Sequence, residues 1–348
     1  MAKKTLLPKN IAELLETASF EDLKTVFDIC ELDARGGTLQ QSTLAYSECS
    51  DELAFWLVDH GADLAAPDKN GDTPLHSRAR NWKCATRILL ELGADLHPGE
   101  DGRGTPLHFA AEAGHPATVR LLLDYGARVN ALNSDGQNAL ERALQRCSNA
   151  QIRQMAAIAE MLINAGAERS DAARAAITRI GTDFEFHRAS FNPDHLTATN
   201  AGLEQLYVLF DVPPVAKRAV HDGTSPIVTT AQEWEDRYQE WWALLVPSNG
   251  PAQTVQGEVI RIAGRITREL DGNGGGNWDA AYDQMADAFL AHVRSGTPLP
   301  DREIAETAAL VGTVKRKSDG AARLCELAVD WVGLNPEPIT LPRPSYRR

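Results

Sequence analysis

The feature that most constrains the fold of this chain is a four-residue segment that occurs twice at a fixed distance. Residues 73–76 read TPLH, and residues 105–108 read TPLH again, 32 residues later. Each copy is followed by an apolar run with a Gly-Ala pair, LLELGAD at 89–95 and LLLDYGA at 121–127. A repeat of this length cannot bury its apolar face alone and needs neighbours of the same kind. This region therefore has to build a stacked array.

Weaker copies extend the array in both directions. Residues 42–45 read STLA ahead of ELAFWLVDHGAD, and residues 138–141 read NALE ahead of AEMLINAGAE. Residues 10–35 hold two short amphipathic stretches that fit a capping repeat, and an extra stretch at 148–155 lengthens the last copy. The sequence thus predicts roughly five units over residues 9–170.

These motifs resemble the ankyrin repeat, in which TPLH opens the first of two helices and a Gly-Ala pair follows the second. The residue chemistry fits such a unit, because Thr caps a helix, Pro suits its first turn and Gly ends a helix at positive φ. The resemblance implies an all-α solenoid and a structural role for His76 and His108, whose rings would bridge neighbouring loops.

Past residue 170 the repeat is lost, but apolar residues keep the spacing of amphipathic helices. The segment 232–245, QEWEDRYQEWWALL, begins a series of such stretches, and no alternation typical of strands interrupts it. We expect four regions: a solenoid in 1–170, a helical extension and connector in 171–231, a helical C-terminal domain in 232–334, and a Pro-rich tail in 335–348 that is extended or disordered.

The nine residues at 271–279, DGNGGGNWD, raise the question of a phosphate-cradling loop. Such a loop follows a strand and carries a lysine, whereas this one follows a predicted helix and lies between Asp271 and Asp279. We therefore expect the turn of an αα-hairpin. Gly272 would end the first helix in a left-handed cap, and Asn277 would cap the second.

The sequence predicts no catalytic, cofactor-binding or metal-binding residues. It has no nucleophile elbow, phosphate-loop lysine or dinucleotide fingerprint. His187, His195 and His221 fall in predicted loops without metal-ligand spacing, and Glu258 and Glu269 have no adjacent partner on their helix. An enzyme with its site in residues 180–334 stays open as a less favoured alternative.

Charge and composition narrow the class of partner. The net charge is −13, from 35 Lys+Arg and 48 Asp+Glu, which is not the basic footprint of a nucleic-acid-binding protein. An acidic surface favours a basic protein partner. Because the chain shows no signal peptide, no long apolar segment and only five scattered cysteines, we expect a cytoplasmic protein away from membranes, monomeric when free.

The resemblance implies a non-catalytic protein-binding function that uses the finger tips between units and the exposed side of the first helices. Within this class, the acidity favours a bacterial immunity protein that neutralises a toxin, as in a toxin–antitoxin pair. An adaptor or effector scaffold is the alternative. Trp82 stands where the repeat usually has glycine, so it is either an exposed anchor or packed under the next unit. The candidate partner-binding residues are Lys69, Asn70, Asp72, Arg80, Asn81, Trp82, Asp101, Arg103, Glu112, Ser134, Asp135, Gln137, Gln145 and Arg146.

Overall fold

The computed structural model describes residues 2–83, 85–99 and 102–346, and the chain packs into two compact units. The first unit runs to Phe184 and includes Phe191–Val215. The second comprises Glu185–Ser190 and the chain from Ala216 onward. Each unit has its own apolar core. Packing thus divides the chain near residues 185–190 and 215, whereas the sequence-based boundaries fell at 170, 231 and 334.

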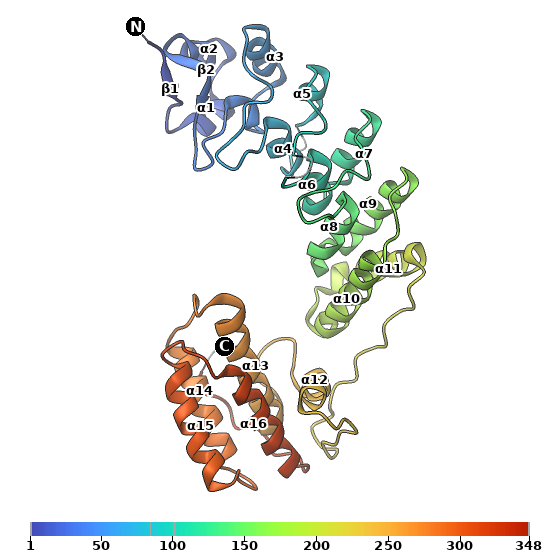
Figure 1. Ribbon diagram of the computed structural model, residues 1–348, viewed down its shortest axis with the longest axis vertical. Coiled ribbons are helices and arrows are strands. Elements are labelled where there is room, and N and C mark those ends of the chain that lie inside the picture. Colours follow the sequence, from blue (N-terminus) through green and yellow to red (C-terminus); the bar gives the residue numbers. More distant parts are fainter. Residues whose placement is uncertain (1, 84, 100–101, 347–348) are drawn as a thin grey trace. The chain divides into compact units, whose positions relative to one another are not determined.

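The first unit is a stack of helix pairs, and Figure 1 shows the pairs following one another in chain order. The fold is an all-α, ankyrin-type solenoid, as predicted. The pairs are α1 (Ile11–Thr17) with α2 (Phe20–Ile29), η1 (Thr43–Ala45) with α3 (Asp51–Asp59), α4 (Pro74–Ala79) with α5 (Arg87–Glu91), α6 (Pro106–Ala113) with α7 (Pro116–Asp124), and α8 (Ala139–Arg146) with α9 (Ile152–Asn164).

The capping residues of a motif support the first helix of its unit. In α6 the Thr105 side chain and the His108 ring cap the first turn reciprocally, and Gly114 ends the helix at φ 76°. The STLA segment lacks both the Pro and the His, and it forms only the three-residue turn η1. The extra stretch at 148–155 forms the short helix η2 (Asn149–Gln151) and the start of α9.

Two parts of the first unit differ from the sequence-based expectations. A short parallel pair of strands, β1 (Lys4–Leu6) and β2 (Cys30–Arg35), stands beside the capping helices and was not predicted. The loop expected around His187 is mostly helix, because α10 (Asp171–His187) runs on into η3 (Arg188–Ser190) and α11 (Pro193–Phe210) begins soon after. Helix α11 packs against α9, so the apolar core of the stack continues to Val212.

The second unit is a bundle built around one long helix. Helix α13 (Val255–Asn273) packs against α12 (Trp234–Leu245), α14 (Ala280–Val293) and α16 (Ala321–Leu334), and α15 (Asp301–Val314) packs against α14 and α16. The apolar stripe of α13 is buried, including Val259, Ile262 and Ile266. None of the described helices is long and apolar enough to cross a bilayer.

The glycine-rich segment connects α13 to α14, which pack against each other, so it is the turn of an αα-hairpin. Both predicted caps were wrong by two residues. Gly272 lies inside α13, and Gly274 is the left-handed cap at φ 57°. Asp279, in place of Asn277, caps α14 by accepting from two backbone amides.

Inside this turn, Glu269 holds the loop together. Its carboxylate accepts hydrogen bonds from the backbone N–H of Asn277 at 2.5 Å and from the side chain of Asn273 at 3.0 Å. A buried acid that binds loop amides stabilises one turn conformation. The loop is therefore organised by the protein's own carboxylate.

The Pro-rich tail is extended, and its described part is packed against the second unit. The backbone of Ile339 accepts from Val255 N–H and donates to the Gln256 side chain, and Leu341 N–H donates to Gln253. Tyr346 is 7% exposed and lies in the core of the bundle. Of the two expectations for the tail, extended or disordered, the disordered one is therefore wrong for residues 335–346.

Candidate protein-binding face

Two buried histidines fix the fingers to the first helices. The His108 ring accepts from Thr105 N–H at Nδ1 (3.0 Å) and contacts the Gln137 carbonyl through Nε2 (3.1 Å), which binds one unit to the next finger. His76 makes the equivalent contacts to Thr73 and to the Gly104 carbonyl. Burial lowers the pKa of both rings, so both stay neutral at pH 7. The implied structural role of these histidines matches this geometry.

The finger loops are shaped by one side chain each. The Asp68 carboxylate accepts from the backbone N–H groups of Asn70 and Asp72, and the Asn133 amide oxygen accepts from those of Asp135 and Gln137. These Asx-type turns close the finger on its own backbone. Next to these turns, Asn70, Ser134 and Asp135 are exposed.

Most of the candidate residues lie at the surface. Asp72 is the exception, because only 3% of its surface is exposed. Asp101 lies outside the described residues. Lys69 donates to the Thr38 carbonyl at 2.6 Å. The exposed members are Lys69, Asn70, Trp82, Arg103, Ser134, Asp135, Gln145 and Arg146, and the half-buried members are Arg80, Asn81, Glu112 and Gln137.

Asp72 is buried because it joins two arginines from neighbouring units. Its Oδ2 accepts from Arg80 Nη2 at 2.5 Å and from Arg103 Nη1 at 3.0 Å. The Arg80 and Arg103 side chains remain 35% and 49% exposed. We call this set the Asp72 triad; with two guanidinium groups and one carboxylate, it carries a net charge of +1.

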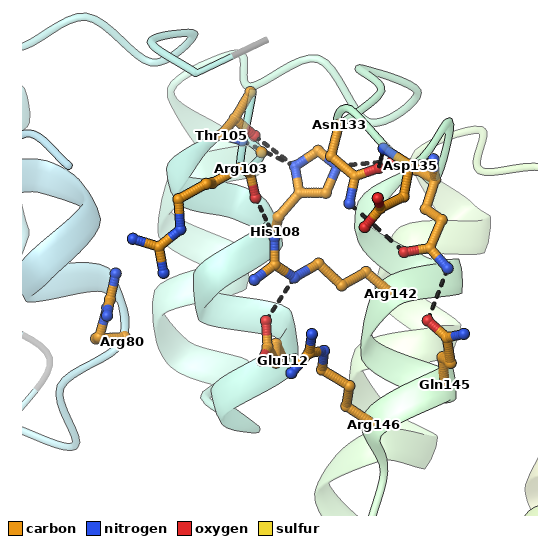
Figure 2. Close-up of polar contacts among 12 residues, drawn as sticks. Arg80, Arg103, Thr105, His108, Glu112, Asn133, Asp135, Arg142, Gln145 and Arg146 are labelled. Atoms are coloured by element: carbon orange, nitrogen blue, oxygen red, sulfur yellow. Dashed lines mark hydrogen bonds and ion pairs between the residues drawn. The ribbon is translucent and has the colours of Figure 1, made fainter. Parts of the chain in front are cut away.

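A second triad of the same kind follows one unit later. Glu112 accepts from Arg142 Nε at 2.5 Å and pairs with Arg146 Nε at 3.5 Å. Figure 2 shows Arg142 reaching across from α8 to Glu112 on α6, with Arg146 beside it. We call this set the Glu112 triad, and its net charge is also +1. It crosses the boundary between two repeats.

The two triads meet at a single aromatic ring. The guanidinium carbons of Arg80, Arg142 and Arg103 lie 4.4, 5.0 and 5.7 Å from the centre of the Phe109 ring. Arg142 also donates through Nη1 to the backbone carbonyl of Arg103. Phe109 itself is 4% exposed. The result is a basic surface on the first-helix side of the stack, with an aromatic floor beneath three arginines.

The comparison with known proteins decides the family of this stack. The family model for ankyrin repeats (3 copies) matches residues 42–133 and 86–171. Residues 42–171 of the chain are ankyrin repeats.

Relatives share the repeats within otherwise different proteins. A putative E3 ubiquitin-protein ligase of Arabidopsis thaliana, XBAT35, is 42% identical over 87 residues, which is 24% of this chain and 19% of that protein. The human ankyrin repeat and SOCS box protein 16 is 31% identical over 255 residues, 69% of this chain and 51% of that protein. The mouse ankyrin repeat and SOCS box protein 5 is 35% identical over 100 residues, 28% of this chain and 29% of that protein. This chain thus spans about half or less of the relatives it matches.

Two residues of the face were missed by the sequence reasoning, Phe109 and Arg142. They occupy the same place in consecutive ankyrin repeats, four residues after the capping Thr105 and Asn138. Equivalent positions of stacked repeats lie side by side, so this correspondence was readable once the repeat register was known. The contact-residue pattern of the family instead drew attention to the finger tips.

Trp82 is exposed in the ankyrin domain. Its residue is 74% exposed, and Lys83 Nζ lies 6.0 Å from the ring centre. The Lys83 ammonium also pairs with Glu16 and Glu48. Of the two interpretations of this residue, the exposed aromatic is the one that the structure favours.

The three histidines considered for an enzyme site, His187, His195 and His221, do not form a cluster. His195 lies in α11 rather than in a loop, and His187 ends α10. The His221 ring is bound to its own turn, through the Gly223 N–H and the Ser225 carbonyl. Within the described part of the chain, no group of three His, Cys, Asp or Glu side chains is placed to hold a metal ion. Burial raises the pKa of the Cys49 and Cys147 thiols to about 11 and about 12, which leaves them unreactive.

Proposed function

We propose that this chain is a non-catalytic binding protein whose ankyrin domain recognises another protein through the face that carries the Asp72 and Glu112 triads. The observation that carries the proposal is the clustering of three arginines over Phe109, contributed by three consecutive repeats; Arg103 is exposed, and Arg80 and Arg142 are half-buried. Arginines and aromatic residues supply most of the binding energy at protein interfaces.

A contribution to stability does not by itself account for the triads. An ion pair open to solvent, such as that of Arg146 with Glu112, contributes only about 0–1 kcal/mol to stability. Three like charges around one ring repel one another, and only two carboxylates offset the four guanidinium groups. A surface that binds a partner accounts for this excess of arginine.

Two refinements of this function remain proposals. The net charge of −13 supports an immunity protein that sequesters a basic toxin, whose basic surface would meet the acidic remainder of the chain rather than the triads. The relatives named for a SOCS box support an adaptor, because their names give ankyrin repeats and a SOCS box in one protein, and this chain likewise contains both ankyrin repeats and a helical bundle. Co-expression with the product of a neighbouring gene separates them: an immunity protein restores growth that the neighbour abolishes, whereas an adaptor does not.

Site-directed photo-crosslinking tests the binding face itself. A photoreactive residue replaces Gln145, which is exposed near Arg146, and in a matched control it replaces Arg120, which is exposed on α7 of the same stack. In cells that naturally contain the chain, we expect a discrete crosslinked protein from position 145 and none from position 120. Equal crosslinking from both positions, or none from 145, would contradict the proposed face.

A further inference from the structure

The face that carries the Asp72 and Glu112 triads is positively charged, whereas the chain as a whole is negatively charged. The positive charge of this face indicates which kind of partner it binds. The four arginines of the two triads outnumber their two carboxylates, in a chain whose net charge is −13. Resting on the proposed function, we propose that the docking partner presents an acidic peptide segment, with at least two carboxylates that bind the Asp72 triad and the Glu112 triad together.

Unused donors support this assignment. A guanidinium group has five N–H donors and no acceptor, so an incoming group must supply acceptors. Among the described residues, the Arg103 guanidinium makes one hydrogen bond, to Asp72, and Arg146 approaches Glu112 only at 3.5 Å. Carboxylates match these donors in a bidentate geometry, whereas a basic segment would add repulsion.

The arginines are also held in place before a ligand arrives. Arg80 and Arg142 stack on Phe109, and Arg142 is fixed by Glu112 and by the Arg103 carbonyl. Fixing a long side chain in advance removes part of the entropy cost of binding. Sharing one acid between two arginines leaves each guanidinium partly free for a second acid.

Long-range charge works against this partner, and that has a measurable consequence. An acidic segment is repelled by the net charge of the chain and attracted only within reach of the triads. The Debye length is about 8 Å at physiological ionic strength, so salt screens the distant repulsion more than the direct contacts. The association rate should therefore not rise as salt is lowered, in contrast to electrostatically steered pairs.

Selection of random peptides displayed on phage, with the full chain as bait, tests the chemistry without a known partner. We expect the selected peptides to be enriched in Asp and Glu over the starting library. The double variant Arg103→Glu, Arg146→Glu should lose these peptides and select Lys- and Arg-containing ones, while the control Arg120→Glu should keep the acidic set. Each arginine of the triads should contribute roughly tenfold to the affinity of a selected peptide.

Three outcomes would overturn the proposal that the partner presents an acidic segment. Two of them are selected peptides without enrichment in acidic residues and the absence of any selected peptide. In either case, crosslinking from position 145 would still support the proposed binding face. Binding of a short single-stranded RNA through the same arginines, with the affinity of the acidic peptides, would instead assign the face to a nucleic-acid ligand. Loss of crosslinking from position 145 would count against the proposed function itself.

Discussion

Tyr346 donates a hydrogen bond from its hydroxyl to Oε1 of Glu258 at 2.5 Å, so the end of the described chain is fastened inside the first turns of α13. Glu258 is fully buried, and its carboxylate also accepts from Arg261 and from the Ala252 N–H. A buried acid with this many donors is stable as the anion. The tail is thus part of the core of the second unit.

Tyr346→Phe should destabilise the second unit, because it removes a hydrogen bond to a buried charge and leaves the ring in place. We expect the free energy of unfolding of this unit to fall by about 1.5–3 kcal/mol. Urea denaturation followed by tryptophan fluorescence would measure it, since Trp241 and Trp331 lie in this core. A change no larger than that of an exposed substitution such as Glu235→Gln would contradict the fastening role of the tail.

The same carboxylate should make the second unit acid-sensitive. Burial alone would raise the pKa of Glu258, but the Arg261, Tyr346 and Ala252 hydrogen bonds outweigh it and hold the pKa below its usual value of 4.5. A carboxyl with a lowered folded-state pKa contributes stability above its unfolded pKa, and that contribution is lost as the pH falls through the folded value.

The stability of the second unit should therefore fall as the pH is lowered below about 4.5, and Glu258→Gln should remove this pH dependence. At neutral pH that variant should cost roughly 3–5 kcal/mol, because Arg261 stays buried without its counter-charge. Thermal unfolding of both proteins across pH 3–7 would check this, and parallel pH profiles for the two would rule the assignment out.

The sequence predicted the elements of this protein better than the contacts between them. Helical spacing placed all five helices of the second unit, and TPLH placed α4 and α6, because both signals are local. The triads join residues from different repeats, and only the stacking register brings Glu112 and Arg142 together. Glu258 and Arg261 are three residues apart on one helix, so that pair was visible in the sequence but overlooked.

His108→Ala should destabilise the ankyrin domain more than any loss of packing volume would explain. The substitution leaves the Thr105 N–H and the Gln137 carbonyl buried without their partner, at a cost of about 1–3 kcal/mol for each group. His195→Ala, at an exposed position of α11, is the matched control and should change the unfolding free energy by less than about 0.5 kcal/mol.

The lowered pKa of His108 adds a pH signature to this prediction. Because burial favours the neutral ring, its contribution is complete above the unfolded pKa of about 6.5 and declines as the pH falls through the folded value. Wild-type stability should therefore decrease on acidification from pH 7, and the decrease should be smaller in His108→Ala. An equal decrease in both proteins would assign the effect to other groups.

The glycine-rich turn should tolerate substitution at one glycine and resist it at two others. Gly274 and Gly275 have φ of 57° and 72°, a region that β-branched residues rarely adopt, and a Cβ at Gly275 would lie 3.0 Å from the Lys317 side chain. Gly274→Val and Gly275→Val should each destabilise the second unit by roughly 2 kcal/mol or more. Gly272 lies within α13, and a Cβ added there would meet no described atom within 4 Å, so Gly272→Ala should stabilise the unit by about 0.5–1 kcal/mol. Urea midpoints of the three variants measure this order, and equal effects would mean that the cap is not at Gly274.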